Sequence, residues 1–181
     1  DLFLDYNYSM RQLRGIEIKR FNRKVKKDIH ITKEIVIILF GVDYQANLGI
    51  IFRLADALGA KKLYLTGGSI APSGHVFERV SRYKERVVEW EFEQDIEKVT
   101  KNLNSEGYEI VGVEITEESQ RFDKYVWGAK TALVLGNEGH GIPDKVLKLC
   151  DKSVFIPMLG KGGSLNVGVA TAIVGYSFLL Q

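Results

Sequence analysis

Three stretches of the sequence combine glycine-rich turns with polar side chains that could bind or position a ligand. They are NLGIIFRLADALGA (Asn47–Ala60), LVLGNEGHGIP (Leu133–Pro143) and IPMLGKGGSLNVGVATAI (Ile156–Ile173). Each stretch includes or follows a short apolar run of the kind that forms a buried strand. Because the carboxyl ends of parallel strands meet at one edge of a sheet, we expect the three stretches to converge on a single pocket.

Arg53 is the most informative residue of the first stretch. It is the only charged residue between Asp43 and Asp56, and its neighbours are apolar. An arginine on a largely buried helix needs an anionic partner, because burial without one is costly. Two partners are compatible with the sequence: Asp56, three residues on, or a phosphate of a bound nucleic acid. Asn47, at the start of the same stretch, is placed to cap the helix.

The second stretch ends a strand in a loop with three glycines, Gly136, Gly139 and Gly141. Such a loop allows backbone groups to approach a ligand closely, although it is neither a dinucleotide-binding GxGxxG nor a P-loop. Glu138 could hold a ribose hydroxyl, an amine or a neighbouring helix end. We interpret His140 as a surface residue rather than a catalytic one.

The third stretch repeats this arrangement, with a strand that leads into a glycine-rich loop and then a helix. Ser164 follows Gly162 and Gly163, and we expect it to cap the final helix. Asn166 then falls in the first turn, where its amide would face the same cleft. The sequence therefore predicts polar groups from three separate segments at one pocket.

Metal chemistry and secretion are not indicated. Cys150 is the only cysteine, and the three histidines, His30, His75 and His140, are far apart. No zinc-ligand spacing is present, so we expect no metal site. The first residues lack the basic region and apolar core of a secretory signal, and a single cysteine fits a reducing compartment. We therefore expect a cytoplasmic protein.

The charge is concentrated near the amino terminus. Residues 11–33 hold nine basic and two acidic residues, a net charge of +7 in a chain whose total is only +2. We interpret residues 1–33 as a basic, partly helical arm that contacts nucleic-acid phosphates, against the alternative of a solvated helix with ordinary surface lysines. The candidate phosphate contacts are Arg20, Arg23, Lys24, Lys26 and Lys27. The candidate docking residues are Leu13, Ile16, Phe21 and Val25.

The remaining residues, 34–181, alternate between strand and helix patterns. Apolar runs predict strands at residues 35–40, 62–66, 109–113, 132–136 and 153–157, with a further extended piece at 86–90. Helical spacing predicts helices at residues 47–58, 93–103 and 164–180. The fold class is therefore α/β, with a mainly parallel sheet flanked by helices. The uncharged last helix has nearly the length of a membrane span, but polar residues interrupt it. We expect it to be buried against the sheet and a second subunit, with no membrane contact.

Taken together and in this order, the three stretches resemble the three motifs of the SpoU (TrmH-like) branch of the SPOUT methyltransferases. The resemblance runs from about Ile35 to Leu180 and has one departure, Gly168, where serine is commoner. It implies an S-adenosylmethionine-dependent RNA 2'-O-ribose methyltransferase. It also implies a deep trefoil knot in the C-terminal part and a homodimer with the active site near the subunit interface. Only the resemblance supports the knot, because threaded chains are rare.

The resemblance also assigns roles to individual residues. It implies cofactor contacts at Glu114, Leu135, Gly136, Asn137, Gly139, Ile156, Met158, Ser164 and Leu165. It implies a catalytic group of Arg53, Asn47, Glu138, Ser164 and Asn166, with Arg53 at the ribose 2'-hydroxyl. Because arginine loses its proton only above a pH of about 12, two roles stay open for Arg53. It could act as the base with help from an RNA phosphate, or it could orient the hydroxyl and stabilise the developing oxyanion.

The RNA itself is less well defined. The arm is too short for the separate RNA-binding domain of many ribosomal-RNA members and is closer to that of tRNA-modifying members. This favours tRNA over rRNA, with a guanosine in the D-loop as one candidate nucleotide. The alternatives are an rRNA 2'-O-methyltransferase, a non-catalytic RNA-binding relative, and an ordinary doubly wound nucleotide enzyme, which would require a GxGxxG that is absent here.

Overall fold

The computed structural model describes residues 11–28 and 32–181. The chain divides into two compact units, Asp1–Thr32 and Lys33–Gln181. The described part of the first unit holds helix α1 (Ile16–Asp28), which has an acidic residue in its first turn and two lysines in its last. This placement complements the helix dipole.

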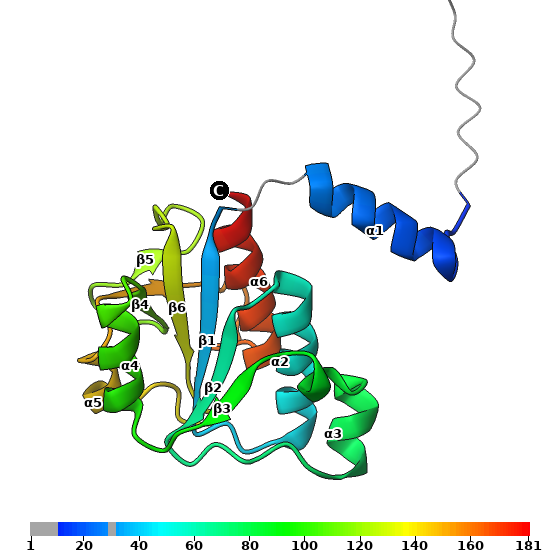
Figure 1. Cartoon of the computed structure of the whole chain (residues 1–181). Helices are drawn as coiled ribbons and strands as arrows, with labels where there is room; N and C mark the ends of the chain where they lie inside the picture. Colours follow the sequence, from blue (N-terminus) through cyan, green and yellow to red (C-terminus); the bar gives the residue numbers. More distant parts are fainter. Residues whose placement is uncertain (1–10, 29–31) are drawn as a thin grey trace, which may run out of the picture. The chain divides into compact units, whose positions relative to one another are not determined.

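The second unit is built on one seven-stranded sheet in which all the neighbouring strands are parallel (Figure 1). The strand order is β3-β2-β1-β6-β4-β7-β5. The strands are β1 (Glu34–Phe40), β2 (Lys62–Thr66), β3 (Trp90–Phe92), β4 (Glu109–Val113), β5 (Gln120–Arg121), β6 (Lys130–Leu135) and β7 (Lys152–Phe155). The helical elements are α2 (Gln45–Leu58), α3 (Gly74–Ser81), the 3-10 turn η1 (Lys84–Arg86), α4 (Ile96–Ser105), α5 (Asp144–Leu147) and α6 (Val167–Leu180).

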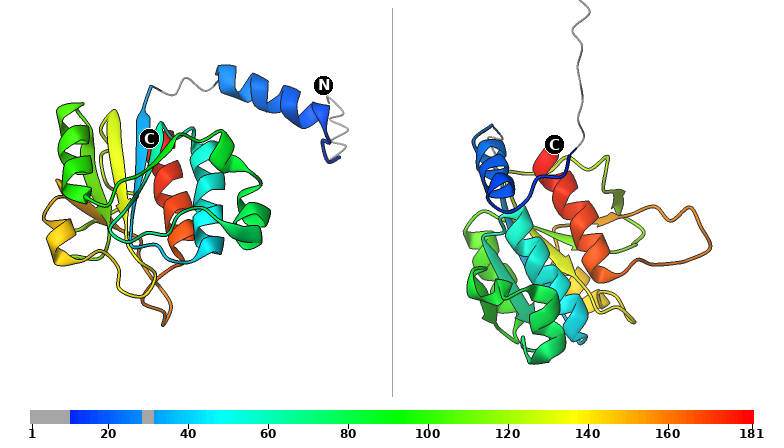
Figure 2. Two further views of the ribbon diagram at one scale, coloured as in Figure 1. Left: turned by 60° about the horizontal axis from the view of Figure 1, so that its bottom comes forward. Right: turned by 90° about the vertical axis from the view of Figure 1, so that its right-hand side faces the viewer.

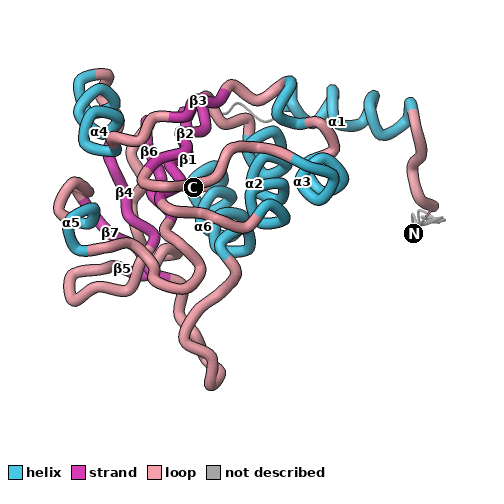
Figure 3. The backbone as a smooth tube through the Cα atoms, turned by 90° about the horizontal axis from the view of Figure 1, so that it is seen from below, coloured by secondary structure: helices cyan, strands magenta, loops and turns pink. Residues whose placement is uncertain are grey.

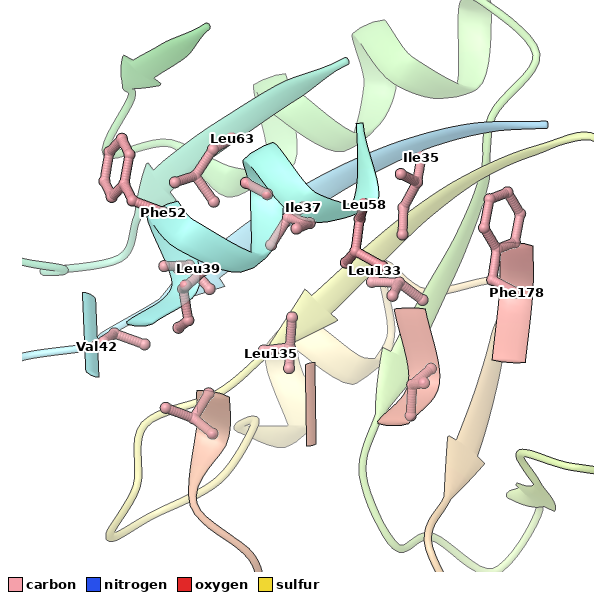
Figure 4. Packing of buried hydrophobic residues seen from close by; sticks show 14 of the residues in the cluster. Ile35, Ile37, Leu39, Val42, Phe52, Leu58, Leu63, Leu133, Leu135 and Phe178 are labelled. Atoms are coloured by element: carbon pink, nitrogen blue, oxygen red, sulfur yellow. The ribbon is translucent and has the colours of Figure 1, made fainter. Parts of the chain in front are cut away.

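Alternate residues of the central strand β1 enter two different hydrophobic cores. Ile35, Ile37 and Leu39 pack with α2 and α6, whereas Val36 and Ile38 pack with α4. Figure 3 shows the resulting layers, with α2, α3 and α6 on one side of the sheet and α4 and α5 on the other. Figure 4 shows the first core, in which side chains of β1, β6 and α2 meet. Both faces are covered, which explains the continuous apolar runs in the strands.

Helix α6 lies directly against α2, and glycines make this approach possible. A Cβ atom on Gly168 would lie 2.6 Å from Ile50, and one on Gly175 would lie 2.6 Å from Leu58. A serine at position 168 would therefore require the Ile50 side chain to move. The departure at Gly168 serves close helix packing, as the sequence indicated.

The predicted α/β class and parallel sheet are confirmed, but several boundaries are wrong. The segment expected to be extended at residues 86–90 begins as the 3-10 turn η1, and β3 starts only at Trp90. The strand expected at 153–157 ends at Phe155, where its pairing with β5 ends. The short elements α3, α5 and β5 were not predicted, because none is long enough to show a clear period.

The final helix begins at Val167 rather than at Ser164, and a loop precedes it that projects from the rest of the unit (Figure 2). Its burial is also less complete than expected, since Val169, Tyr176 and Leu180 are exposed in the single chain. Within the described residues, no helix has both the length and the apolar character that a membrane crossing requires. An exposed apolar strip on α6 is what a subunit contact would cover.

Candidate active site

A cavity of about 430 Å³ opens at the carboxyl ends of β4, β6 and β7. Its walls come from the segment after β4, the loop after β6 and the loop before α6. All nine predicted cofactor contacts line it: Glu114, Leu135, Gly136, Asn137, Gly139, Ile156, Met158, Ser164 and Leu165. The cavity is within the size range of small-ligand pockets, and it lies where open α/β sheets bind ligands.

The loop after β6 folds back tightly on itself. The Gly141 amide donates to the carbonyl of Asn137 over 2.9 Å, and the Asn137 side chain accepts from the Gly139 amide over 2.8 Å. The Asn137 amide group also donates to the carbonyl of Gly41 over 2.7 Å, which fixes the loop to the end of β1. A Cβ atom on Gly136 would lie 2.2 Å from backbone atoms of Gly141. Only glycine fits at position 136.

Glu114 positions this loop from the end of β4. One carboxylate oxygen accepts from the Ile142 amide over 2.9 Å, and the other accepts from the Ile115 amide over 2.9 Å. Gly141, whose φ is +66°, lies so close that a Cβ atom there would be 2.3 Å from the same carboxylate. Glu114 therefore lines the pocket and also holds the loop that forms its opposite wall.

Three of the predicted catalytic residues form one hydrogen-bonded chain across the three motifs. The Asn47 amide group donates to the Glu138 carboxylate, and the Asn47 oxygen accepts from Asn166 over 2.8 Å. These residues come from α2, the loop after β6 and the start of α6. The chain of contacts fixes the Glu138 carboxylate at the pocket wall and explains why two asparagines are needed.

Two predicted helix caps are wrong. Tyr44, not Asn47, is the N-cap of α2, and Asn47 lies inside the first turn with its side chain committed to Glu138 and Asn166. Asn166, not Ser164, caps α6, and its side-chain oxygen accepts from the amides of Gly168 and Val169. Ser164 lines the pocket instead. Sequence alone offered two polar residues near the helix start, and only the path of the chain decides between them.

Arg53 does not lie in the pocket of its own chain. It is exposed on α2, six residues or about 9 Å along the helix axis from Asn47. The expected partner Asp56 instead pairs with Lys84 over 2.6 Å. Among the described residues, no carboxylate is within salt-bridge distance of Arg53, so its guanidinium stays accessible to an external anion. The interpretation of α2 as a helix that buries Arg53 is wrong, because α2 buries only the face toward the sheet.

Apolar pocket residues were the ones that sequence reasoning missed. Val113, Phe155 and Val167 line the cavity, together with His140 and Asp144. From the sequence, the first three residues look like ordinary core residues, because an apolar residue at the end of a strand has the same pattern whether it lines a pocket or packs in the core. The exposed His140 ring lies 3.2 Å from the Asn137 side chain, in keeping with its interpretation as a surface residue.

The chain's single thiol, that of Cys150, lies outside this pocket. Burial raises the pKa of Cys150 to about 12, and the sulfur donates to the carbonyl of Val146. Over the residues that the structure describes, which leave out His30, no cluster of side chains could hold a metal ion. Direct transfer between bound ligands fits this pocket better than covalent catalysis through sulfur.

The double role of Asn166 leads to a prediction. Asn166→Asp keeps the oxygen that caps α6 but replaces the amide that donates to Asn47 by a second acceptor, so we expect the cap to be retained and the kcat to fall by about tenfold or more. Asn166→Ala loses both functions and should also lower stability by about 1 kcal/mol. Thermal unfolding and single-turnover methyl transfer measure the two effects separately. Equal activity of the wild type and the aspartate variant would contradict a role for the Asn47 contact.

The fold and the pocket define an α/β protein that binds a small ligand at the carboxyl ends of its strands. Residues 34–176 match the model of the SpoU rRNA Methylase family, and the chain belongs to this family. It is 28% identical over 151 residues to the tRNA (guanosine(18)-2'-O)-methyltransferase of Aquifex aeolicus, covering 80% of this chain and 68% of that protein.

Two solved structures agree with this assignment. The TrmH/SpoU tRNA modifying enzyme of A. aeolicus superposes with a TM-score of 0.74 at 25% identity, over 91% of this chain and 84% of that one. The AdoMet-bound rRNA methyltransferase of Sinorhizobium meliloti gives a TM-score of 0.75 at 25% identity, over 84% of this chain and 58% of that one. Both tRNA and rRNA enzymes are therefore among the proteins that this chain resembles.

Proposed function

We propose that the protein transfers a methyl group from S-adenosylmethionine to a ribose 2'-hydroxyl of RNA, with tRNA favoured over rRNA. The observation that carries the proposal is the Glu138–Asn47–Asn166 chain at the edge of a pocket lined by all nine expected cofactor contacts. A non-catalytic relative would have no need for polar groups from three motifs held in one arrangement. The similarity to a guanosine-18 enzyme supports tRNA.

The pocket residues fit S-adenosylmethionine, which supplies an electrophilic methyl group when bound. Leu135, Ile156 and Met158 offer an apolar wall for a purine ring. The loop around Gly163 leaves room for the polar parts of the ligand, since a Cβ atom at Gly163 would meet nothing within 4 Å. The chemistry of the lining thus combines an apolar surface with backbone donors and acceptors.

The chain's own residues would then position the ribose. Glu138, held by Asn47, and Ser164 line the pocket and can orient hydroxyl groups. Arg53 would either lose its own proton transiently, with help from an RNA phosphate, and then accept the 2'-hydroxyl proton, or it would stabilise the developing oxyanion. Because Arg53 lies outside its own pocket, we propose that a second copy of the chain supplies it, across a face that includes the exposed Ile50, Val169 and Tyr176.

The proposed C-terminal trefoil knot is supported by contacts of α6. The connection between β4 and β6 covers the end of this helix, with the rings of Trp127 and Phe178 centred 5.8 Å apart. The Ser177 hydroxyl donates to the carbonyl of Phe122 in the same connection over 3.4 Å. These contacts bring the connection against the last turns of α6, as the proposed knot requires.

The proposed RNA contact of α1 leads to a second prediction. Its basic residues are exposed, and its net charge suits phosphate binding. Reversing Lys24, Lys26 and Lys27 to glutamate should weaken RNA binding and reduce its salt dependence by up to about one logarithmic slope unit for each lost contact. S-adenosylmethionine affinity should not change. Unchanged RNA affinity would show that the arm is not an RNA contact.

The proposed function is tested by calorimetric titration together with product mapping. S-adenosylmethionine should bind and NAD should not, which separates this reading from an ordinary nucleotide enzyme. Unmodified tRNA and 23S rRNA transcripts are then incubated with cofactor, and the 2'-O-methyl sites are mapped. Methylation of tRNA supports the favoured substrate, and methylation of rRNA alone selects the alternative. Cofactor uptake with no methylation of either RNA would contradict the proposal.

A further inference from the structure

The segment that joins α3 to β3 is strongly basic, and the proposed reaction does not use it. We call residues 79–87 the basic turn. It carries Arg79, Arg82, Lys84 and Arg86 against the single acid Glu85. Lys84 is committed to Asp56, and Arg86 lies 3.9 Å from the Glu85 carboxylate, but all three arginines are exposed. A surface with three exposed guanidinium groups, of which those of Arg79 and Arg82 have no ion-pair partner among the described residues, is suited to a polyanion.

The backbone of the basic turn is unusual for the residues that it holds. Arg82 and Tyr83 have φ values of +51° and +61°, and they are the only non-glycine residues with positive φ in the described parts of the chain. The Tyr83 amide donates to the Ser81 hydroxyl over 3.2 Å, and that hydroxyl donates to Glu85 over 3.0 Å. Glycine would adopt this conformation at lower cost. Large side chains at both positions indicate that those side chains have a use.

The aromatic ring of Tyr83 projects into solvent. The residue is 52% exposed, and the Arg86 guanidinium lies 4.7 Å from the ring centroid. This cation–π contact orders the ring without burying it. An ordered, exposed tyrosine among arginines is the combination with which proteins stack on unpaired bases and track the adjoining phosphates.

The basic turn lies along the same edge of α2 as Arg53. Gly49 of α2 meets α3, because a Cβ atom there would lie 2.9 Å from Val80, and Asp56 of α2 pairs with Lys84 of η1. Arg53 follows Gly49 by four residues and precedes Asp56 by three, so all three lie on one side of the helix. Figure 1 shows α2 and α3 side by side. An RNA strand that reaches Arg53 would therefore pass the basic turn.

We propose that the basic turn is an RNA-binding site that holds the strand next to the target nucleotide. Arg79, Arg82 and Arg86 bind the phosphates, and Tyr83 stacks on an unpaired base. This inference rests on the proposed function and adds a substrate contact that is separate from the arm and from the pocket. It assigns the turn to substrate positioning rather than to the transfer step.

Two variants of the full chain test the proposal with a fluorescent unmodified tRNA transcript. Replacing the three arginines by glutamine should weaken binding at least tenfold and reduce the salt slope by about 2, since single-stranded contacts contribute about 0.7 each. Tyr83→Leu should raise the KM for tRNA about tenfold with an unchanged salt slope, because stacking releases no counterions. Tyr83→Phe should behave as the wild type. The kcat and S-adenosylmethionine affinity should be unchanged in all variants.

The matched control is Lys98→Gln with Lys101→Gln, which removes charge from α4 on the opposite face of the sheet and should leave tRNA binding unchanged. Equal losses in the control and the arginine variant would overturn the proposal, as would a Tyr83→Leu variant that changes the oligomeric state and not the KM. If the wild-type protein methylates tRNA and the basic-turn variants bind and methylate tRNA equally well, the proposed site at the basic turn is refuted and the proposed function is not. A wild-type protein that neither binds nor methylates RNA refutes the proposed function, and the turn site with it.

Discussion

Arg53→Ala is expected to reduce methyl transfer by at least about a hundredfold while S-adenosylmethionine still binds. The expected size follows from the roles open to Arg53, because removing a group that stabilises an oxyanion or moves a proton costs about 10²- to 10⁴-fold in rate. Arg53 is exposed on α2 and does not line the pocket, so neither folding nor cofactor affinity should depend on it. Single-turnover transfer to tRNA and calorimetric titration measure the two properties.

A lysine at the same position tests which property of the Arg53 guanidinium the reaction needs. Lysine keeps the positive charge but loses the planar fork of donors. Partial activity in Arg53→Lys would favour charge stabilisation, and its complete loss would favour bidentate orientation of the ribose and phosphate. Lys61→Ala, which removes another exposed cation after α2, should leave turnover unchanged. Wild-type turnover in Arg53→Ala would remove Arg53 from the catalytic group.

The position of Arg53 also allows a test of shared active sites. An Arg53→Ala chain has an intact pocket, and a chain with a disabled pocket keeps an intact Arg53. If Arg53 acts on the partner's pocket, mixing the two inactive variants should restore about a quarter of wild-type activity, because half of the dimers are mixed and each has one complete site. If Arg53 acts within its own chain, the mixture stays inactive.

Gly136→Ala is expected to abolish cofactor binding, the second large effect. The new methyl group would lie 2.2 Å from the backbone of Gly141 and 2.6 Å from the Ile142 amide, and neither can move as a flexible side chain could. The loop after β6 must shift, which breaks the contact between Ile142 and Glu114 that shapes the pocket. Overpacking of this kind costs about 1–3 kcal/mol, and each kcal/mol lowers the Tm of a chain of this size by about 2–4 °C.

Gly139→Ala is the matched control in the same loop. A Cβ atom there would meet only the Asn137 side chain, at 3.4 Å, and Gly139 has no positive φ. We expect a small change in Tm and measurable cofactor binding. Calorimetric titration and thermal unfolding of both variants make the comparison. Tight S-adenosylmethionine binding by Gly136→Ala would show that the loop after β6 does not form the cofactor site.

Local sequence patterns were enough to predict the central strands and the end of α2. The apolar runs that became β1 and β6 were visible because both faces of a central parallel strand are buried. Gly59 was identifiable as the residue that ends α2, since its φ of +64° is a conformation that glycine adopts readily. The short elements could not be predicted, because they depend on contacts between segments that are distant in the sequence. The turn η1 depends on the Lys84–Asp56 contact with α2, which no local pattern encodes.

By itself, the sequence determined the α/β class and the three motifs, because these depend on periodicity and on residue types in short segments. Through the family resemblance it also indicated nine of the residues that line the pocket. Only the tertiary structure decided what each polar group does. Asn166 caps α6 and binds Asn47, Glu114 holds the loop that faces it, and Arg53 lies outside its own pocket. Each of these facts depends on contacts between segments that are distant in the sequence, and the packing of the sheet and helices determines those contacts.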